Sequence, residues 1–224
     1  MGEAVKRRYD GSRRQEQARA TRRAILTAAH DLFVSQGYAR TTVAEVATVA
    51  GVSVESVYAA FKNKPTLLHR VWDLTVGGDD EEVLLHERPE VVELMAEADL
   101  ATRLRKHARI ATALARRTGP FLRAVEAAAG AEAAAAAMLV EIDRQRYDGI
   151  GHMARAAAAT GQLAVSEQEC RDLVWSTTDA VLWHRLVEQR GWTDERFAEH
   201  LGETWVSWLV SAPAARRGSR RSSP

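Results

Sequence analysis

Residues 41–58 of the chain read TTVAEVATVAGVSVESVY, and they carry the strongest structural signal in the sequence. Two helices that cross steeply need a small residue where their backbones touch, and Ala47 supplies it. The tight turn between them needs a residue that tolerates a positive φ, and Gly51 stands four positions later. The segment therefore predicts a helix-turn-helix, with its two short helices at about 43–50 and 54–60.

Polar residues mark the starts of these two helices. Thr42 and Glu45 have the spacing of a capping box, in which the two side chains satisfy backbone amides at a helix start. Ser53 is a suitable N-cap for the second helix. Four apolar residues of the two helices and their turn are expected to form the buried contact between these helices: Val46, Ala50, Val52 and Val57.

The rest of the chain also predicts helices and no strand, since apolar residues recur at spacings of three and four. One helix carries its apolar stripe from Ala24 to Phe33 and should stop at Gly37, and Pro65 opens another. Gly77, Gly78 and the acidic run from Asp79 to Glu82 predict a loop between two domains.

Longer helices are expected beyond that loop. Their expected ranges are about 99–118, a short one from Pro120 to Gly130, 131–159, 166–189, and a last one capped by Thr193. Gly149 and Gly151 inside the third of these predict a kink or a close helix contact. The fold class is therefore all-α, in two domains.

The charge of the chain is concentrated at its ends. The net charge of the 224 residues is only +1, yet eight Lys and Arg against three acidic residues precede position 24. The tail after Pro213 adds four Arg and no acid. Basic ends are typical of a protein that meets a polyanion, and they are equally typical of solvated, disordered tails.

Composition argues against a membrane-spanning, secreted or disulfide-bonded protein. The apolar runs are too short to span a bilayer, and the polar first 23 residues do not resemble a signal peptide. A lone Cys170 excludes an internal disulfide and a thiolate metal site. We expect a cytoplasmic protein with no membrane partner, no metal and no cofactor.

Residues on both sides of the helix-turn-helix point to one particular protein family. The stretch from Arg19 to Trp72 resembles the DNA-binding domain of the TetR family of bacterial repressors. The elements that carry the resemblance are Phe33 and Tyr38 around Gly37, Thr41-Thr42, Gly51-Val52-Ser53, Tyr58 with Phe61, and Lys64 ahead of Leu67-Leu68. The chain departs from the family at Ala60, where an aromatic residue or His is frequent, so one backbone contact is expected to be missing.

The resemblance implies an N-terminal three-helix DNA-binding domain with a helix-turn-helix, followed by a C-terminal helical ligand-binding and dimerisation domain. The expected boundaries are a disordered basic arm (1–18), the helix-turn-helix domain (19–64), a connecting helix (65–78), the ligand-binding and dimerisation domain (79–211), and a disordered basic tail (212–224).

Site residues follow from the same resemblance. Val54, Glu55 and Ser56 would face base edges in the major groove. The residues expected to hold phosphates are Thr42, Tyr58, Lys62 and Lys64. Thr41 and Ser53 are also expected to contact DNA.

The last two helices are expected to pair with their copies in a homodimer. The segment 166–189 is apolar on nearly all sides, and five of the six Trp lie at or after Trp175. The expected interface residues are Leu173, Ala180, Leu182, Trp183, Leu186, Val187, Trp205 and Trp208. The alternative is that these residues fill the core of a monomer.

A small-molecule effector is expected to bind among the helices from 99 to 160. Its lining would include Leu104, His107, Ile110, Met138, Tyr147 and Trp175, although each of these also suits plain core packing.

Function is expected to be transcriptional regulation. The preferred hypothesis is a repressor on a palindromic operator in double-stranded DNA, released by an unidentified effector. The alternatives are a regulator without effector, an activator, or a helical ligand-binding protein or enzyme whose basic ends are incidental. No nucleophile beside a base, phosphate-cradling Gly loop or carboxylate cluster is evident in the sequence, which argues against an enzyme.

Overall fold

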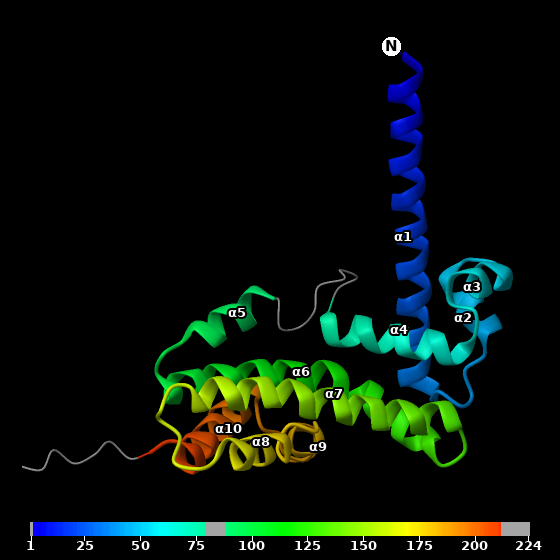
Figure 1. Ribbon diagram of the computed structural model, residues 1–224. Coiled ribbons are helices and arrows are strands. Elements are labelled where there is room, and N and C mark those ends of the chain that lie inside the picture. The colour runs from blue at the N-terminus through cyan, green and yellow to red at the C-terminus, as the bar shows by residue number, and fades with distance from the viewer. Residues whose placement is uncertain (1, 79–87, 212–224) are drawn as a thin grey trace, which may run out of the picture. The chain divides into compact units, whose positions relative to one another are not determined.

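The computed structural model describes residues 2–78 and 88–211, with side chains from Gln15 onward. The acidic run Asp79 to Glu82 and the basic tail from 212 lie outside them. The described elements (Figure 1) are α1 (Gly2–Gln36), α2 (Val43–Ala50), α3 (Val54–Phe61), α4 (Lys64–Gly77), α5 (Pro89–Ala96), α6 (Leu100–Ala129), α7 (Ala133–Ala158), α8 (Glu167–Trp175), α9 (Val181–Trp183), the π-helical turn η2 (His184–Glu188) and α10 (Asp194–Leu209). Within this part, the one β-type pairing is an isolated bridge between Leu163 and Val210, so the all-α prediction is confirmed.

The chain forms two compact units. The first comprises Met1–Arg88 and Leu114–Gln145, and the second comprises Pro89–Ala113 and Arg146–Pro224. Helices α6 and α7 each contribute residues to both units. The expected boundaries instead assigned residues 114–145 to the second domain, 79–211.

The core of the first unit is built around Phe121 of α6. The Phe121 ring lies 6.4 Å from that of Phe33 in α1 and 6.1 Å from that of Trp72 in α4, measured between ring centroids. Ile25 of α1 and Leu68 of α4 belong to the same buried cluster. The second half of α6 thus completes the core of the helix-turn-helix unit.

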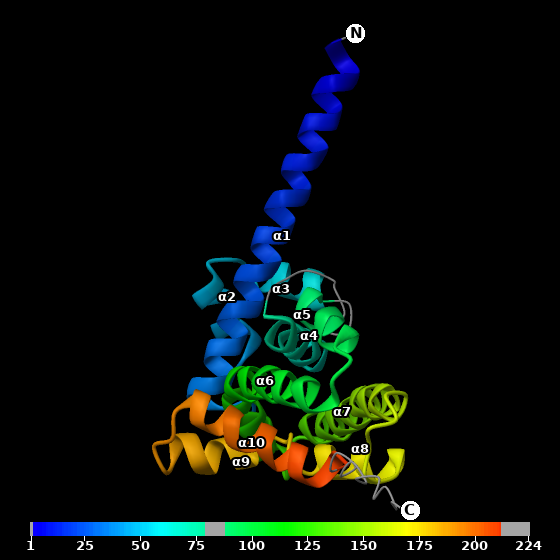
Figure 2. The same ribbon diagram turned by 90° about the vertical axis from the view of Figure 1, so that its left-hand side faces the viewer.

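Helix α1 is longer than the sequence suggested. A disordered arm was expected up to residue 18, whereas the helix begins at Gly2 and runs well past α2 and α3 (Figures 1 and 2). Its sequence holds no Pro and many Arg, Gln, Glu and Ala, which all favour helix. It ends where expected, because Gly37 takes a φ of +90° while its amide donates to the carbonyl of Phe33.

The helix-turn-helix forms as its caps predict. The Thr42 hydroxyl accepts from the amide of Glu45, and the Glu45 carboxylate accepts from the amide of Thr42 at 2.7 Å. Gly51 ends α2 in the left-handed region with φ +68°, and Ser53 caps α3. The axes of α2 and α3 are bent by 107°, within the range typical of helix-turn-helix motifs.

A side chain of α6 also secures the C-terminal end of α4. The Arg117 guanidinium donates from Nε to the carbonyl of Thr75 at 2.7 Å, and a second nitrogen donates to the carbonyl of Val76. These carbonyls have no partner within their own helix. Gly78, at φ +80°, leaves room for the guanidinium, because a Cβ there would lie 3.0 Å from it.

In the second unit, α5 and the group α8 to α10 lie on opposite sides of α6 and α7 (Figures 1 and 2). Helix α10 packs closely on α6, since a Cβ on Gly202 would lie 3.2 Å from the Cα of Arg105. The buried Arg103 donates to the carbonyls of Glu97 and Ala156 and so joins α6 to α7.

The single helix expected over 166–189 is broken after Trp175. Hydroxyl groups in the run Ser176–Thr177–Thr178 donate to the carbonyls of Leu173 and Val174. Ser, Thr and Asp side chains compete in this way for backbone groups and disfavour a continuing helix. Asp179 then accepts from the amide of Val181, and Ala180 takes a positive φ of 65°.

The expected helix break at Pro120 is wrong, whereas at Gly149 and Gly151 the second of the two expected forms, a close helix contact, is found. Helix α6 continues through Pro120 because burying Phe121 and Val125 outweighs the one backbone bond that Pro removes. Helix α7 is assigned without a break at Gly149 and Gly151. Gly151 instead makes the close contact, because a Cβ there would lie 2.9 Å from the guanidinium carbon of Arg171.

The described residues were also considered as a metal site and as membrane-spanning helices. Over residues 2–78 and 88–211, no group of three or more His, Cys, Asp or Glu is placed to hold a metal ion. In the same ranges no single helix has the length and apolarity to cross a membrane, and only the bent pair α2–α3 meets that criterion.

The same substitution at two glycines should have opposite effects on stability. Gly51→Ala should lower the free energy of unfolding by about 1 kcal/mol, because a Cβ disfavours the left-handed backbone there. Gly149→Ala should raise it by about 0.5–1 kcal/mol, because alanine favours helix. Neither new Cβ meets an atom within 4 Å. Urea unfolding of both variants checks this, and shifts of equal sign would contradict it.

The capping box should make stability depend on pH. Hydrogen bonds from the Thr42 amide and hydroxyl lower the pKa of Glu45 below its usual 4.5. A lower pKa in the folded state means that the carboxylate stabilises the fold above pH 4.5 and loses this effect as the pH falls further. The Tm loss caused by Glu45→Gln should therefore be larger at pH 7 than at pH 3. Glu126→Gln serves as the control for replacing an exposed carboxylate of the same unit, and an equal loss from Glu45→Gln at both pH values would contradict the prediction.

Candidate nucleic-acid interface

Helix α3 presents one face to solvent and buries the other. Val57 and Phe61 are buried in the first unit, whereas Glu55 and Ser56 are exposed and Val54 is half-buried. The Tyr58 side chain is 49% exposed, so it does not serve as a core residue. The face formed by Val54, Glu55, Ser56 and Tyr58, here called the exposed face of α3, holds four of the nine residues expected to contact DNA.

The first turn of α3 is held by its own polar side chains. Ser53 Oγ accepts from the amide of Ser56 at 3.2 Å and lies 3.0 Å from Ser56 Oγ. Hydrogen bonds from its own amide and from the Ser53 hydroxyl lower the pKa of Glu55. An ionised, positioned carboxylate on this face can accept a hydrogen bond from the amino group of a cytosine.

The two threonines ahead of α2 differ in accessibility. Thr42 is exposed at the helix start, where its hydroxyl takes part in the capping box. Thr41 is only 1% exposed, and its hydroxyl donates to the carbonyl of Gly37 at 2.9 Å. The sequence placed Thr41 among the DNA-contacting residues, but its side chain is used to close the loop and does not reach the surface.

The two lysines that follow α3 also differ. Lys62 is exposed and ends α3 with an unusual backbone, φ +61° and ψ −47°. Lys64 is half-buried: its Nζ lies 4.2 Å from the centre of the Tyr38 ring and donates to the carbonyl of Ala39. Burial lowers the pKa of Lys64, and the nearby carboxylates of Glu132 and Glu45 oppose this effect. Lys64 therefore joins α4 to the loop after α1. Of the two lysines, Lys62 is the more exposed to solvent.

Two arginines near the interface, Arg22 and Arg40, are not among the nine residues expected to contact DNA. The Arg22 guanidinium lies 4.7 Å from the centre of the Phe61 ring and donates to the carbonyl of Ala60 at 3.5 Å, so it supports the end of α3. Arg40 is exposed in the loop before α2 and donates to the carbonyl of Gln36. The only sequence signal for either residue is its charge, because both depend on the fold of α1 against α3.

The six residues expected to line the ligand site do not all belong to the same unit. Met138 lies in the core cluster of the first unit, and the other five lie in the second unit. Leu104 is fully buried, and His107 and Ile110 keep part of their surface accessible.

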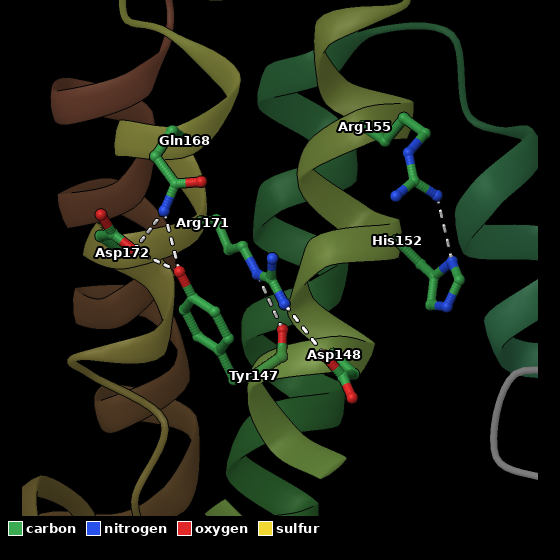
Figure 3. A network of polar contacts seen from close by, with 7 residues as sticks. All are labelled: Tyr147, Asp148, His152, Arg155, Gln168, Arg171 and Asp172. Atoms are coloured by element: carbon green, nitrogen blue, oxygen red, sulfur yellow. Dashed lines mark hydrogen bonds and ion pairs between the residues drawn. The ribbon is translucent and has the colours of Figure 1, made fainter. Parts of the chain in front are cut away.

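Tyr147 belongs to a polar network that ties α7 to α8 (Figure 3). The Tyr147 hydroxyl donates to Asp172 and accepts from Gln168, while the Arg171 guanidinium lies 3.5 Å from the Tyr147 ring centre. Trp175 packs edge-on against Tyr147. The polar groups of Tyr147 thus already have partners within the chain.

Three of the expected dimer residues are buried within one chain. Trp205 is fully buried and donates from Nε1 to Thr177, and Trp183 donates to Asp194. Ala180 is also buried. The alternative of a monomer core thus holds for these residues. The partly accessible members are Leu173, Leu182, Leu186 and Val187, and Trp208 is 41% exposed.

Comparisons with known proteins agree with the geometry of α1 to α4. The family model described as "Bacterial regulatory proteins, tetR family" matches residues 25–71. The HTH-type transcriptional regulator TtgR of Pseudomonas putida is 41% identical over 61 residues, which are 27% of this chain and 29% of that protein. The chain thus matches less than a third of the length of this curated relative.

Solved structures extend the likeness of fold beyond that segment. The SmeT–triclosan complex has a TM-score of 0.62 at 21% identity and covers 88% of this chain and 96% of its own. Native NalD, the secondary repressor of the MexAB-OprM multidrug efflux pump in Pseudomonas aeruginosa, has a TM-score of 0.62 at 19% identity, covering 88% and 100%. The predicted resemblance to the TetR family of bacterial regulatory proteins is thus confirmed over residues 25–71, and the likeness of fold extends over most of the chain.

Proposed function

We propose that the protein is a transcriptional regulator that binds operator DNA as a homodimer. The observation that carries the proposal is the exposed face of α3, held on a folded helix-turn-helix with the exposed Lys62 at its end. An α-helix fits the major groove, where polar side chains at its N-terminal end read base edges. The exposed hydroxyls and ammonium beside it suit phosphate contacts.

Repression relieved by a small molecule is the preferred form of this function. NalD is named as a repressor, and SmeT is seen with triclosan, so both properties occur among proteins of this fold. An effector that prefers one separation of the two α3 helices would shift the population of the dimer and change its DNA affinity.

A dimer would place two α3 helices on two half-sites of a palindromic operator, about 34–36 Å apart or a multiple of that spacing. The surface proposed for dimerisation is the partly accessible apolar set in α8 to α10, with Trp208 as its most exposed aromatic residue. Aromatic residues are enriched at the centres of such interfaces.

DNA binding is tested by footprinting and fluorescence anisotropy with the full chain on the DNA that flanks its own gene. We expect a protected palindrome and an affinity that falls steeply with salt. Absence of protection, or an affinity that does not change with salt, would contradict the proposed function and favour a helical ligand-binding protein.

Lys62→Ala should weaken DNA binding without changing sequence preference. Losing one phosphate contact per protomer should make the negative slope of log K against log salt shallower by about 1.8 for a dimer. Lys106→Ala is the matched control, because Lys106 lies on α6 of the second unit and pairs with Glu97 at 2.6 Å. An unchanged slope for Lys62→Ala would remove Lys62 from the interface.

Trp208→Glu should weaken dimerisation, because a carboxylate would be buried in an apolar interface. We expect the dimer dissociation constant to rise at least tenfold, corresponding to roughly 1.4 kcal/mol, as measured by sedimentation. Val92→Glu, which alters an apolar residue of α5 that is 53% exposed, is the control and should leave association unchanged. If Trp208→Glu dimerises like the unmodified chain, the interface lies elsewhere.

A further inference from the structure

The exposed face of α3 carries no side chain with a nitrogen donor. The helix, Val54–Phe61, contains no Lys, Arg, Asn or Gln, and its exposed polar side chains are Glu55, Ser56 and Tyr58. Guanine is read in the major groove chiefly by Arg or Lys, and adenine chiefly by Asn or Gln. The N-terminal part of a recognition helix is the part that reaches the bases. This helix therefore lacks the side chains for the two commonest base contacts.

Glu55 is the one charged side chain of α3, and it is held in the first turn of the helix. Its own amide and the Ser53 hydroxyl donate hydrogen bonds to the carboxylate and lower its pKa, so the group is ionised at neutral pH. An ionised carboxylate has about four lone-pair sites, and it accepts hydrogen bonds without donating any. Two of these sites are used within the turn, and the exposed side chain leaves the others open to a partner.

Cytosine is the base that best fits such an acceptor. Guanine and thymine present acceptor atoms in the major groove, which are N7 and O6 of guanine and O4 of thymine. Adenine presents its N6 amino group beside the N7 acceptor, and N7 would repel one of the carboxylate oxygens. The N4 amino group of cytosine is a donor with no acceptor beside it on the same base.

A wrong base opposite Glu55 would cost more than one lost hydrogen bond. Without a donor, the carboxylate would lose water among the phosphates, and an unpaired charge removed from water is strongly unfavourable. Leaving one member of a charged pair without its partner also costs more than removing both members. Glu55 therefore disfavours the other bases as well as favouring cytosine, and its removal should reduce selectivity more than affinity.

We propose that Glu55 determines the specificity of this protein by accepting a hydrogen bond from the N4 amino group of a cytosine in each half-site of the operator. The inference rests on the proposed function, because it assigns one base of the DNA that the helix-turn-helix binds. Ser56 and Tyr58 do not discriminate in this way, since a hydroxyl both donates and accepts and so suits every base edge. Glu55 is the acceptor-only side chain on the exposed face of α3.

Selection from a random DNA library with the full chain tests the assignment. We expect a palindrome that contains, in each half-site, one C·G pair whose selection depends on Glu55. Glu55→Ala should lose the preference at that position and keep the preferences elsewhere. Glu55→Gln should prefer A·T there, because an amide pairs with N6 and N7 of adenine. Base preferences that are unchanged in Glu55→Ala would overturn the proposal.

Glu126→Gln is the matched control for these variants. Glu126 is an exposed carboxylate of α6 in the same unit, and it lies outside α3. Its replacement should leave every base preference unchanged. Circular dichroism checks that each variant is folded before its preference is measured.

A modified base tests the contact without changing the protein. Paired with guanine, N4-methylcytosine turns its methyl group into the major groove and keeps the Watson–Crick bonds, so the methyl replaces the N–H that Glu55 would accept. The unmodified chain should bind an operator with this base in both half-sites about a hundredfold more weakly, or about tenfold per half-site. Glu55→Ala should bind both operators equally, and the same base at another C·G pair is the control. Equal binding by the unmodified chain would overturn the proposal.

Failure of this inference can be told apart from failure of the proposed function. If the unmodified chain selects no palindrome, the proposed function fails and this inference fails with it. If the chain selects a palindrome whose base preferences do not depend on Glu55, the proposed function stands and this inference alone fails.

Discussion

Burial of Phe121 is the interaction on which the position of α3 depends. Its ring lies against Phe33 of α1 and Trp72 of α4, the two helices that support the helix-turn-helix. Burying one phenylalanine side chain contributes about 1.5–3 kcal/mol, a large fraction of the stability of an ordinary domain. The same need for burial keeps α6 helical through Pro120. The position of α3 is thus secured by a residue distant in sequence.

Short-range chemistry explains why the helix-turn-helix could be predicted from sequence. The capping box of Thr42 and Glu45, the left-handed Gly51 and the Ser53 cap each involve residues within four positions of one another. Their geometry is set by backbone hydrogen bonds and φ preferences, which do not depend on distant parts of the chain. The exposure of Glu55, Ser56 and Tyr58 follows from helical periodicity once Val57 and Phe61 are buried.

Features that depend on tertiary contacts could not be predicted in this way. The sequence does not show that Thr41 turns inward to Gly37, that Lys64 lies on Tyr38, or that Trp205 is used within its own chain. An apolar stripe has the same appearance whether it faces its own core or a second copy. Only the contacts of each residue separate the two cases.

The shared use of α6 and α7 sets a limit on how this protein can be dissected and recombined. The first unit takes residues 114–145 from beyond the loop that the sequence marks as a domain boundary. A fragment cut at that loop would leave the inner faces of α1 and α4 uncovered. A chimaera that joins a foreign C-terminal domain to this helix-turn-helix unit must therefore keep the second half of α6 and the first half of α7.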